Sequence, residues 1–584
     1  MDSVINAALG KEKFDLVIQN IKLVNLFTKE IYDSEIGIKT GVISHVSHPT
    51  DEPLEGYKYY DGKGKYAIPG LIDTHIHIES TMMTPSNLSN AIVPRGTTTL
   101  ACDPHEIANV MGVEGVQYML ESSEGLPLDV RVLAPSCVPA VPGLETAGAD
   151  LYAKDIEVML GWERVQGLGE IMDFEGLFSG HDRVKDIVDV GKKKDVFIQG
   201  HAPSMIGRRL SAYLNSGVES DHETSFKWEA EYKIRAGMVL ECRESSIVHD
   251  MPTLVPVLKK FGYPENTTIC TDDREPDDLL REGHIDHVIR TGIREGADPI
   301  ELVKMATLNA AKLLRLQDRG VLMPGKRADL VLLNDLVEFE IDEVFVQGEM
   351  VSRKGSMIKR SESMVHPVEI KNTVKINRPI DEDLFKIEAN GKTAVVNVIA
   401  FNPEKHIVTE RQEEELPIIN GSIDISNHKD LCTLAVIERH GRTDNISIAF
   451  VKNFGIEHGA VASTVAHDSH NLVVIGKNLK DMVIAANEVI EANGGIICVE
   501  NGKRTGGVEL PIAGLISPKP IKELAVDTHG LKNAIMHLGI NTVSPIIQVA
   551  AFALPVVPEI RLTDKGLVDV HKQEFIPTII SIKK

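Results

Sequence analysis

Two histidines separated by one residue end an apolar segment near the start of the chain, and the rest of the sequence can be arranged around them. The segment runs from Pro69 to His77 and reads Pro-Gly-Leu-Ile-Asp-Thr-His-Ile-His. On a β-strand, side chains at positions i and i+2 point to the same face. His75 and His77 would therefore present two imidazoles side by side, which suits one metal ion. Because the chain has 21 histidines in 584 residues, a His-x-His pair can arise by chance and is weak evidence for a metal site. The position of this pair, after a Pro-Gly turn and at the end of an apolar strand, is the stronger evidence.

Length and composition bound the class of protein. A chain of 584 residues implies two to four domains, and 43% hydrophobic with 25% charged residues is ordinary for a globular protein. The net charge of −23 excludes non-specific nucleic-acid binding, which needs a basic surface, but not a small nucleobase ligand. The six cysteines are scattered without a C-x-x-C pair, which favours reduced thiols. We found no apolar signal segment and no apolar run of 18 residues, so we expect a cytoplasmic enzyme without membrane contact.

Strand patterns flank a long central region. Residues 15–48 read as short strands, which are too little sheet to be stable alone. Residues 328–333 and 344–351 show the same character far downstream. We predict that these two ends pair into one small flanking β-domain, made of residues 1–66 and 319–365.

Residues 67–318 have the length of a (β/α)₈ barrel of TIM type, and the α/β alternation of short apolar strands with helical patterns agrees with it. Residues 370–584 are predicted to form a C-terminal α+β domain, whose clearest helix, Asp481–Asn493, ends at two glycines. The eight barrel strands are predicted at residues 68–77, 97–103, 130–134, 165–172, 196–201, 217–222, 238–242 and 268–272. Beyond the last strand, helices are predicted over residues 277–295 and 299–314.

Most of these strands end in residues of the types that bind metals in proteins, namely histidine, aspartate and glutamate. Barrel enzymes place their active sites at the C-terminal ends of the strands. Six ligand-type groups exceed the needs of one tetrahedral ion with an open position, so we predict two divalent ions bridged by Glu170. Imidazole and carboxylate ligands without thiolate suit manganese, iron or zinc. The predicted ligands are His75, His77, Glu170, His201, His222 and Asp272.

Further polar residues follow the second and seventh strands. Asp103, His105 and Glu106 are interpreted either as a turn with a helix cap or as groups for substrate contact and proton transfer. Arg243, Glu244 and Ser245 could recognise the edges of the substrate, and for at least one of the three we expect a solvated loop instead.

His467 and His470 are spaced to share one helical face. They could bind a further ion or reach over the barrel mouth. We expect instead a surface loop and leave both residues out of the site.

The sequence resembles the amidohydrolase superfamily at both ends of the predicted barrel. The opening motif is the segment from Pro69 to His77, and the closing one is Ala306-Thr-Leu-Asn-Ala-Ala followed by Gly320-x-x-x-Pro-Gly-x-x-Ala-Asp-Leu. Within the superfamily the similarity is greatest to the adenine deaminase branch, at residues 101–110, 169–172, 200–202 and 221–223 and at Gly506-Gly507 with the following residues 510–516. Glu170 stands where many members carry a carboxylated lysine, which agrees with this branch and counts against a hydantoinase-like or dihydroorotase-like enzyme.

This resemblance implies hydrolytic deamination of adenine to hypoxanthine and ammonia, by metal-activated hydroxide attacking carbon 6. It implies a binuclear centre of manganese or iron and assigns the proton shuttle to Asp272. We predict that Glu170, His105 and Glu106 also take part in catalysis, and that Asp103, Arg243 and Ser245 contact the purine. Free adenine rather than adenosine is the expected substrate, and a homodimer is the expected assembly.

The alternative function is another amidohydrolase-type hydrolase that acts on a cyclic amide or a different amino-heterocycle. A barrel without catalytic activity would not need all six ligand-type residues. The zinc signature of cytidine deaminases, H-x-E with P-C-x-x-C, is absent from the sequence.

Overall fold

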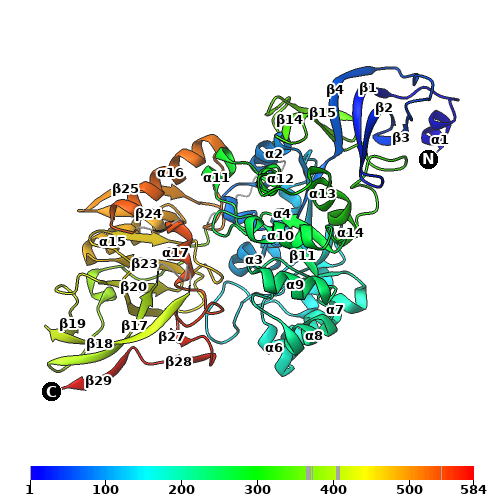
Figure 1. The fold of residues 1–584 in the computed structure, drawn as a ribbon. Coiled ribbons are helices and arrows are strands. Elements are labelled where there is room, and N and C mark those ends of the chain that lie inside the picture. The colour runs from blue at the N-terminus through cyan, green and yellow to red at the C-terminus, as the bar shows by residue number, and fades with distance from the viewer. Residues whose placement is uncertain (1, 363–369, 371, 403–407, 541, 543) are drawn as a thin grey trace.

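The computed structural model describes residues 2–362, 370, 372–402, 408–540, 542 and 544–584. In Figure 1 a small sheet carrying the N-terminus lies at one end, a region of helices around strands lies in the middle, and a second sheet carrying the C-terminus lies at the other end. Among these residues, no helix combines the length and the apolar character that a membrane span requires.

The small sheet joins two segments that flank the central region of the sequence. Its eight strands run in the order β16-β15-β14-β13-β4-β1-β2-β3. Strands β4 and β13 pair antiparallel, with Ile68 opposite Val331. The last residue of β4, Pro69, leads directly into the first barrel strand, so this sheet fixes where the barrel begins. The strands are β1 Leu16–Asn25, β2 Glu30–Lys39, β3 Val42–Val46, β4 Tyr59–Pro69, β13 Leu330–Asp335, β14 Glu340–Val346, β15 Glu349–Arg353 and β16 Ser356–Met357.

The central region has an α/β fold of TIM type. Five parallel strands run in the order β5 to β9 and three more in the order β10 to β12. The Glu219 amide donates to the Ile198 carbonyl at 3.0 Å, and the Asp272 amide donates to the His75 carbonyl at 2.9 Å, so both edges of the two sheets are joined. Each predicted barrel strand overlaps one of these eight: β5 Leu71–Ile76, β6 Thr97–Cys102, β7 Asp129–Ala134, β8 Val165–Ile171, β9 Phe197–Gly200, β10 Ser220–Asp221, β11 Val239–Arg243 and β12 Thr267–Cys270.

Helices cover the outside of these strands. The expected helix over residues 277–295 is wrong as one element, because Gly283 adopts φ +123° and separates α11 from α12. The expected helix over residues 299–314 is interrupted by a π-helical segment, η3. The helices are α2 Pro85–Ile92, α3 His105–Met111, α4 Val113–Ser122, α5 Ala153–Met159, α6 Phe174–Ser179, α7 Asp182–Lys194, α8 Gly207–Ser216, α9 Lys227–Arg235, α10 Met251–Lys260, α11 Pro276–Arg281, α12 Ile285–Arg294, α13 Pro299–Lys304, η3 Met305–Asn309 and α14 Ala310–Leu313.

The C-terminal region is built on a ten-stranded sheet and packs against the barrel. Helix α16 lies beside α11, and Lys532 Nζ in α16 is 2.7 Å from Asp277 Oδ1 in α11 (Figure 1). The predicted helix over residues 481–493 is confirmed as α15. The main elements are β17 Thr393–Phe401, β18 Thr409–Ile419, β19 Ser422–Ile423, β20 Leu431–Ile437, β21 Ile446–Lys452, β22 Ala460–Ser463, β23 Leu472–Gly476, α15 Leu479–Glu491, β24 Gly495–Glu500, β25 Lys503–Glu509, α16 Ile521–His537, α17 Pro545–Ala551 and β29 Ile579–Lys583.

Candidate metal centre and active site

His75 and His77 stand at the C-terminal end of β5 with their outer nitrogens turned toward each other. Gln199 donates its amide hydrogens to Glu241, so its Oε1 accepts from His75 Nδ1 at 2.8 Å. His77 Nδ1 lies 3.0 Å from the Asp103 carbonyl oxygen and donates to it. Since each Nδ1 carries a hydrogen, each neutral ring presents a lone pair at Nε2, and these two atoms are 3.1 Å apart. This is the arrangement in which histidines bind a metal, with the inner nitrogen held by an oxygen.

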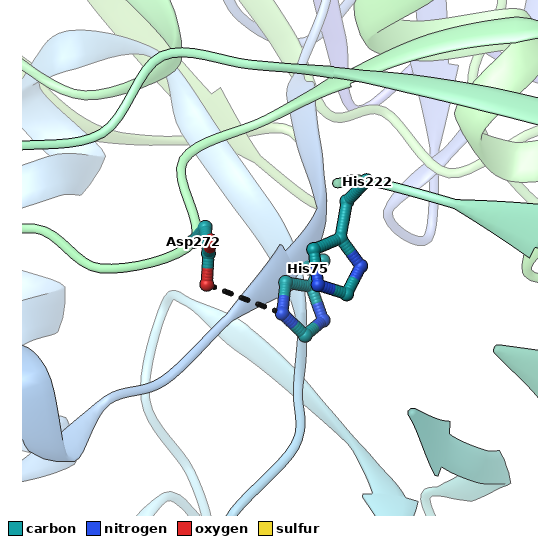
Figure 2. Close-up of side chains that lie close together, drawn as sticks. All are labelled: His75, His222 and Asp272. Carbon is teal, nitrogen blue, oxygen red and sulfur yellow. Dashed lines mark ion pairs between the residues drawn. The ribbon is translucent and has the colours of Figure 1, made fainter. Parts of the chain in front are cut away.

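Asp272 joins this pair from the loop after β12. Its Oδ1 lies 3.1 Å from His77 Nε2 and 3.4 Å from His75 Nε2. Figure 2 shows its carboxylate directed at the His75 ring, beside which the His222 ring lies. Burial opposes ionisation of Asp272, but the contacts with His75 and His77 and the charge of Arg243 outweigh it and hold the pKa well below its usual range. The group is therefore an anion at neutral pH.

Glu170 at the end of β8 faces two sets of histidines with its two oxygens. Oε1 is 3.5 Å from His77 Nε2, whereas Oε2 is 2.7 Å from His201 Nδ1 and 3.4 Å from His222 Nε2. Burial opposes ionisation of this carboxyl, but His201 and His222 outweigh it and hold its pKa well below the usual range. The same pairing raises the pKa of His222 to about 10 against the effect of burial. Glu170 is thus placed to bridge two ligand sets.

The six predicted ligands converge into three overlapping groups whose ligand atoms lie within 4.8 Å of one another. Glu170 belongs to two of these groups, and His75 also belongs to two. Imidazole and carboxylate donors in this number fit a divalent metal ion. The structure brings the predicted ligands together, while the role of each as a ligand stays a prediction. The groups are His75, His222 and Asp272; His75, His77 and Glu170; and Glu170, His201 and His222.

Arg243 pairs with three carboxylates, one of which belongs to the predicted ligand Asp272. Its Nη1 is 2.8 Å from Asp272 Oδ2, its Nε is 3.2 Å from Asp250 Oδ2, and it also pairs with Glu223. Ser245 Oγ accepts the Val248 amide at 2.9 Å within its own turn. Arg243, Glu244 and Ser245 are 5%, 3% and 1% exposed, so the expectation that at least one of them lies in a solvated loop is wrong. These contacts make Arg243 a support for Asp272.

Asp103, His105 and Glu106 lie between β6 and the C-terminal domain, and all three are buried. The expected helix cap lies at Pro104, the N-cap of α3, but Asp103 does not cap the helix with its side chain, because its Oδ2 accepts the Glu170 amide at 2.9 Å and so holds β8. His105 begins α3, and its Nδ1 is 3.6 Å from both Asp103 Oδ1 and Glu170 Oε1. Glu106 Oε1 accepts from Ser80 Oγ at 3.0 Å. His105 therefore touches the proposed bridging carboxylate, and Glu106 does not lie in that contact.

A turn of the C-terminal domain completes this side of the site. The turn, residues 466–471, connects β22 to β23, and within it Asp468 and His470 are 3% and 0% exposed. Asp468 Oδ1 is 3.7 Å from His105 Nε2, and His470 Nε2 is 3.6 Å from Glu106 Oε2. The expectation of a surface loop is wrong, because packing of the two domains buries the turn. No local sequence signal predicts this burial, because a polar loop between two strands ordinarily lies on the surface.

Glu106, His467 and His470 also form a group with the spacing of metal ligands. However, His470 Nδ1 accepts the Ala466 amide at 3.2 Å, so in the neutral ring the hydrogen lies on Nε2. Burial and the charges of His467 and Arg439 hold the pKa of His470 well below its usual value, which keeps the ring neutral. Its Nε2 then carries the hydrogen, 3.6 Å from Glu106 Oε2, and offers no lone pair to a metal.

Several buried polar atoms around this turn have no hydrogen-bond partner among the residues that the structure describes. Such atoms are rare in folded proteins and commonly mark a place for a ligand, an ion or water. Here they gather where the barrel mouth meets the C-terminal domain. They include Asp103 Oδ1, His105 Nδ1, Glu106 Oε2, Asp468 Oδ2 and His470 Nε2.

Comparison with known families agrees with this geometry. The sequence profile of the amidohydrolase family matches residues 66–351, and that of the adenine deaminase C-terminal domain matches residues 406–574. Adenine deaminase 2 of Carboxydothermus hydrogenoformans is 39% identical over 578 residues, covering 98% of each chain. The adenine deaminase of Oleidesulfovibrio alaskensis is 39% identical over 581 residues, covering 99% of this chain and 98% of its own.

Solved structures are more distant. An enamidase of the amidohydrolase superfamily is 18% identical with a TM-score of 0.45, covering 60% of this chain and 98% of its own. A β-aspartyl dipeptidase from Fervidobacterium islandicum is 20% identical with a TM-score of 0.44, covering 59% of this chain and 99% of its own.

Proposed function

The chain belongs to the adenine deaminase family of the amidohydrolases, and we propose that its six-residue centre carries out the hydrolysis of adenine to hypoxanthine and ammonia. In this reaction the bond from carbon 6 to the amino nitrogen breaks and a bond to a water-derived oxygen forms. The observation that carries the proposal is the pair of Nε2 atoms of His75 and His77 at 3.1 Å, each with its Nδ1 held by an oxygen. Such a pair needs a cation between or beside the two nitrogens.

We propose two divalent ions with Glu170 as the shared ligand. This is supported by the division of its oxygens, since Oε1 faces His77 and Oε2 faces His201 and His222. Manganese or iron is proposed from the family, and zinc also suits donors of this type. A bound divalent ion lowers the pKa of a water molecule and so supplies the nucleophile at neutral pH.

Asp272 is proposed to move the proton. One of its oxygens faces the two histidines of β5, and Arg243 holds the other at 2.8 Å. A carboxylate fixed in this way can accept a proton from the attacking water and deliver it toward the leaving amine. Arg243 keeps the carboxylate oriented and ionised, which is the form that a general base requires.

His105 is proposed as a second group that contacts the purine or its proton. The Nδ1 atom of His105 faces Glu170, so the ring lies next to the proposed metal ligands without being one of them. Asp103 is proposed to support it, since Oδ1 of Asp103 lies 3.6 Å from the same nitrogen. A part for Glu106 in proton transfer stays a prediction, and the contacts of Ser245 within its own turn favour a structural role.

Two further predictions complete the proposal. The division into a flanking β-domain of residues 1–66 and 319–365, a barrel of residues 67–318 and a C-terminal domain of residues 370–584 is supported by the pairing of β4 with β13. The homodimer stays a prediction, which light scattering on the purified protein would test.

A panel assay tests the reaction. Purified protein loaded with manganese is incubated with adenine, adenosine, cytosine and dihydrouracil, and ammonia and product are measured for each. Ammonia and hypoxanthine in equal amounts, from adenine alone, are expected. Ring opening of dihydrouracil without ammonia from adenine would contradict the proposal and favour a cyclic amidase.

A further inference from the structure

We infer that Asp468, supplied by the C-terminal domain, is a positioning residue that holds the His105 ring in the active site. The inference rests on the proposed role of His105. It gives the C-terminal domain a part in the chemistry that is separate from its contacts along α11 and α16.

The two nitrogens of His105 face different domains. Nδ1 lies 3.6 Å from Asp103 Oδ1 and from Glu170 Oε1, both in the barrel. Nε2 lies 3.7 Å from Asp468 Oδ1 across the domain boundary. The acceptor on one side of an imidazole decides which nitrogen carries the hydrogen and how the ring is oriented. Asp468 Oδ1 is the carboxylate oxygen that faces Nε2, and it comes from the C-terminal domain.

The surroundings of His105 give its ring one well-defined plane. The ring packs edge to face on His77, with centroids 4.7 Å apart and an interplanar angle of 74°. His105 and Asp468 are each 3% exposed, so water does not substitute freely for either partner. A carboxylate charge beside Nε2 therefore favours the ring orientation in which Nδ1 faces Glu170.

The turn that carries Asp468 is anchored on both sides of the boundary. His440 Nε2 lies 2.8 Å from the Ser469 carbonyl oxygen, and the Arg439 guanidinium donates to the His470 carbonyl. Asn471 Nδ2 donates to the Thr146 carbonyl of the barrel at 2.9 Å. A carboxylate carried on a turn fixed in this way can set the position of a ring. A mobile loop could not do so.

The first test replaces Asp468 by Asn, which keeps the size of the side chain and removes its charge. We expect kcat for adenine to fall about 10- to 100-fold, the usual loss for a supporting residue, with KM and metal content unchanged. Asp468→Glu restores the charge and is expected to recover part of kcat. Asp481→Asn is the matched control, because Asp481 is a buried carboxylate of the same domain that lies in α15, outside the turn, and accepts the Gly502 amide at 2.8 Å.

The second test asks whether Asp468 acts through His105. Asp468→Asn is measured alone, with His105→Asn, and in the double variant. We expect the Asp468 substitution to have no further effect on kcat once His105 is absent, because the two residues act as a unit. Equal fold-losses in both backgrounds would assign the effect to general packing and overturn the inference.

The remaining outcomes are also decisive. If Asp468→Glu recovers no activity over Asp468→Asn, the loss comes from packing of the turn and the inference is overturned. If wild type deaminates adenine and Asp468→Asn does so equally fast, the inference is overturned and the proposed function stands. Absence of ammonia release from adenine by metal-loaded wild-type protein would overturn the proposed function together with the inference.

Discussion

The Nε2 atoms of His75 and His77 lie 3.1 Å apart, and each ring is held at its other nitrogen by an oxygen acceptor. Two lone pairs at this distance repel unless a proton or a metal ion lies against both. The protein maintains the arrangement by burying both rings, which are 0% and 5% exposed. A metal ion that binds there displaces any shared proton, so metal affinity should rise with pH.

Gln199 should affect metal affinity without touching the metal. Its Oε1 accepts from His75 Nδ1 at 2.8 Å, and Gln199→Leu removes that acceptor while keeping the volume. Loss of such a partner typically lowers metal affinity about 10- to 100-fold. Calorimetric titration of the metal-free protein with Mn²⁺ measures the change. Gln117→Leu, at an exposed position on α4, is the control, and an unchanged Kd in Gln199→Leu would contradict the assignment.

Asp272→Asn should separate metal binding from proton transfer. The amide keeps an oxygen toward His75 and His77 but accepts no proton from water. We expect kcat to fall by about two orders of magnitude or more, the scale for loss of a general base, with a modest loss of metal. Steady-state kinetics and metal analysis on the same preparation measure both. A near-normal kcat would show that another residue transfers the proton, with His105 as the first candidate.

Glu145 should make stability depend on pH. Burial, reinforced by the charge of Asp468, raises the pKa of Glu145 from 4.5 to about 8. Between these values the folded protein holds a proton that the unfolded chain has released, so this carboxyl lowers the free energy of unfolding as pH rises from about 4.5 to about 8. Glu145→Gln cannot ionise. The Tm of the variant minus that of wild type should therefore increase from pH 5 to pH 9, and a difference independent of pH would contradict the raised pKa.

The strand ends were predictable from sequence because their signal is local. Apolar runs bounded by turn residues define each barrel strand, and the side chain that follows each run lies at the barrel mouth. Gln199 also had a signal, since it precedes His201 by two residues and shares its face of β9. Gly283 likewise marked the end of α11, although the apolar pattern on both sides suggested one helix.

Contacts between domains were not predictable in this way. No spacing or periodicity connects Asp468 with His105, because the two meet only when the C-terminal sheet packs on the barrel. Helix α3 was missed for a local reason. Its N-cap position is Pro104, and the Asp103 carboxylate is used to hold β8, so the usual side-chain start signal has another function.

Adenine should be hydrolysed with little or no turnover of adenosine. Glu170 among the proposed metal ligands is only 3% exposed, so we expect an enclosed pocket that accepts a base and excludes a ribose on nitrogen 9. Buried polar groups also reject an analogue that leaves them unpaired. The values of kcat/KM for both substrates on one metal-loaded preparation test this. Comparable values would indicate an open nucleoside site.

Adenine deamination is proposed to depend on a metal centre bridged by Glu170, and titration of metal-free protein with Mn²⁺ is the sharpest test of this dependence. Hypoxanthine formation is followed as metal is added to wild type and to Glu170→Gln, with Gln117→Leu as the control. We predict no activity without metal, activity in wild type that saturates at about two equivalents, as expected for a two-metal site, and joint loss of metal and activity in Glu170→Gln. Full metal occupancy with normal turnover in Glu170→Gln, or wild-type activity without metal, would contradict it.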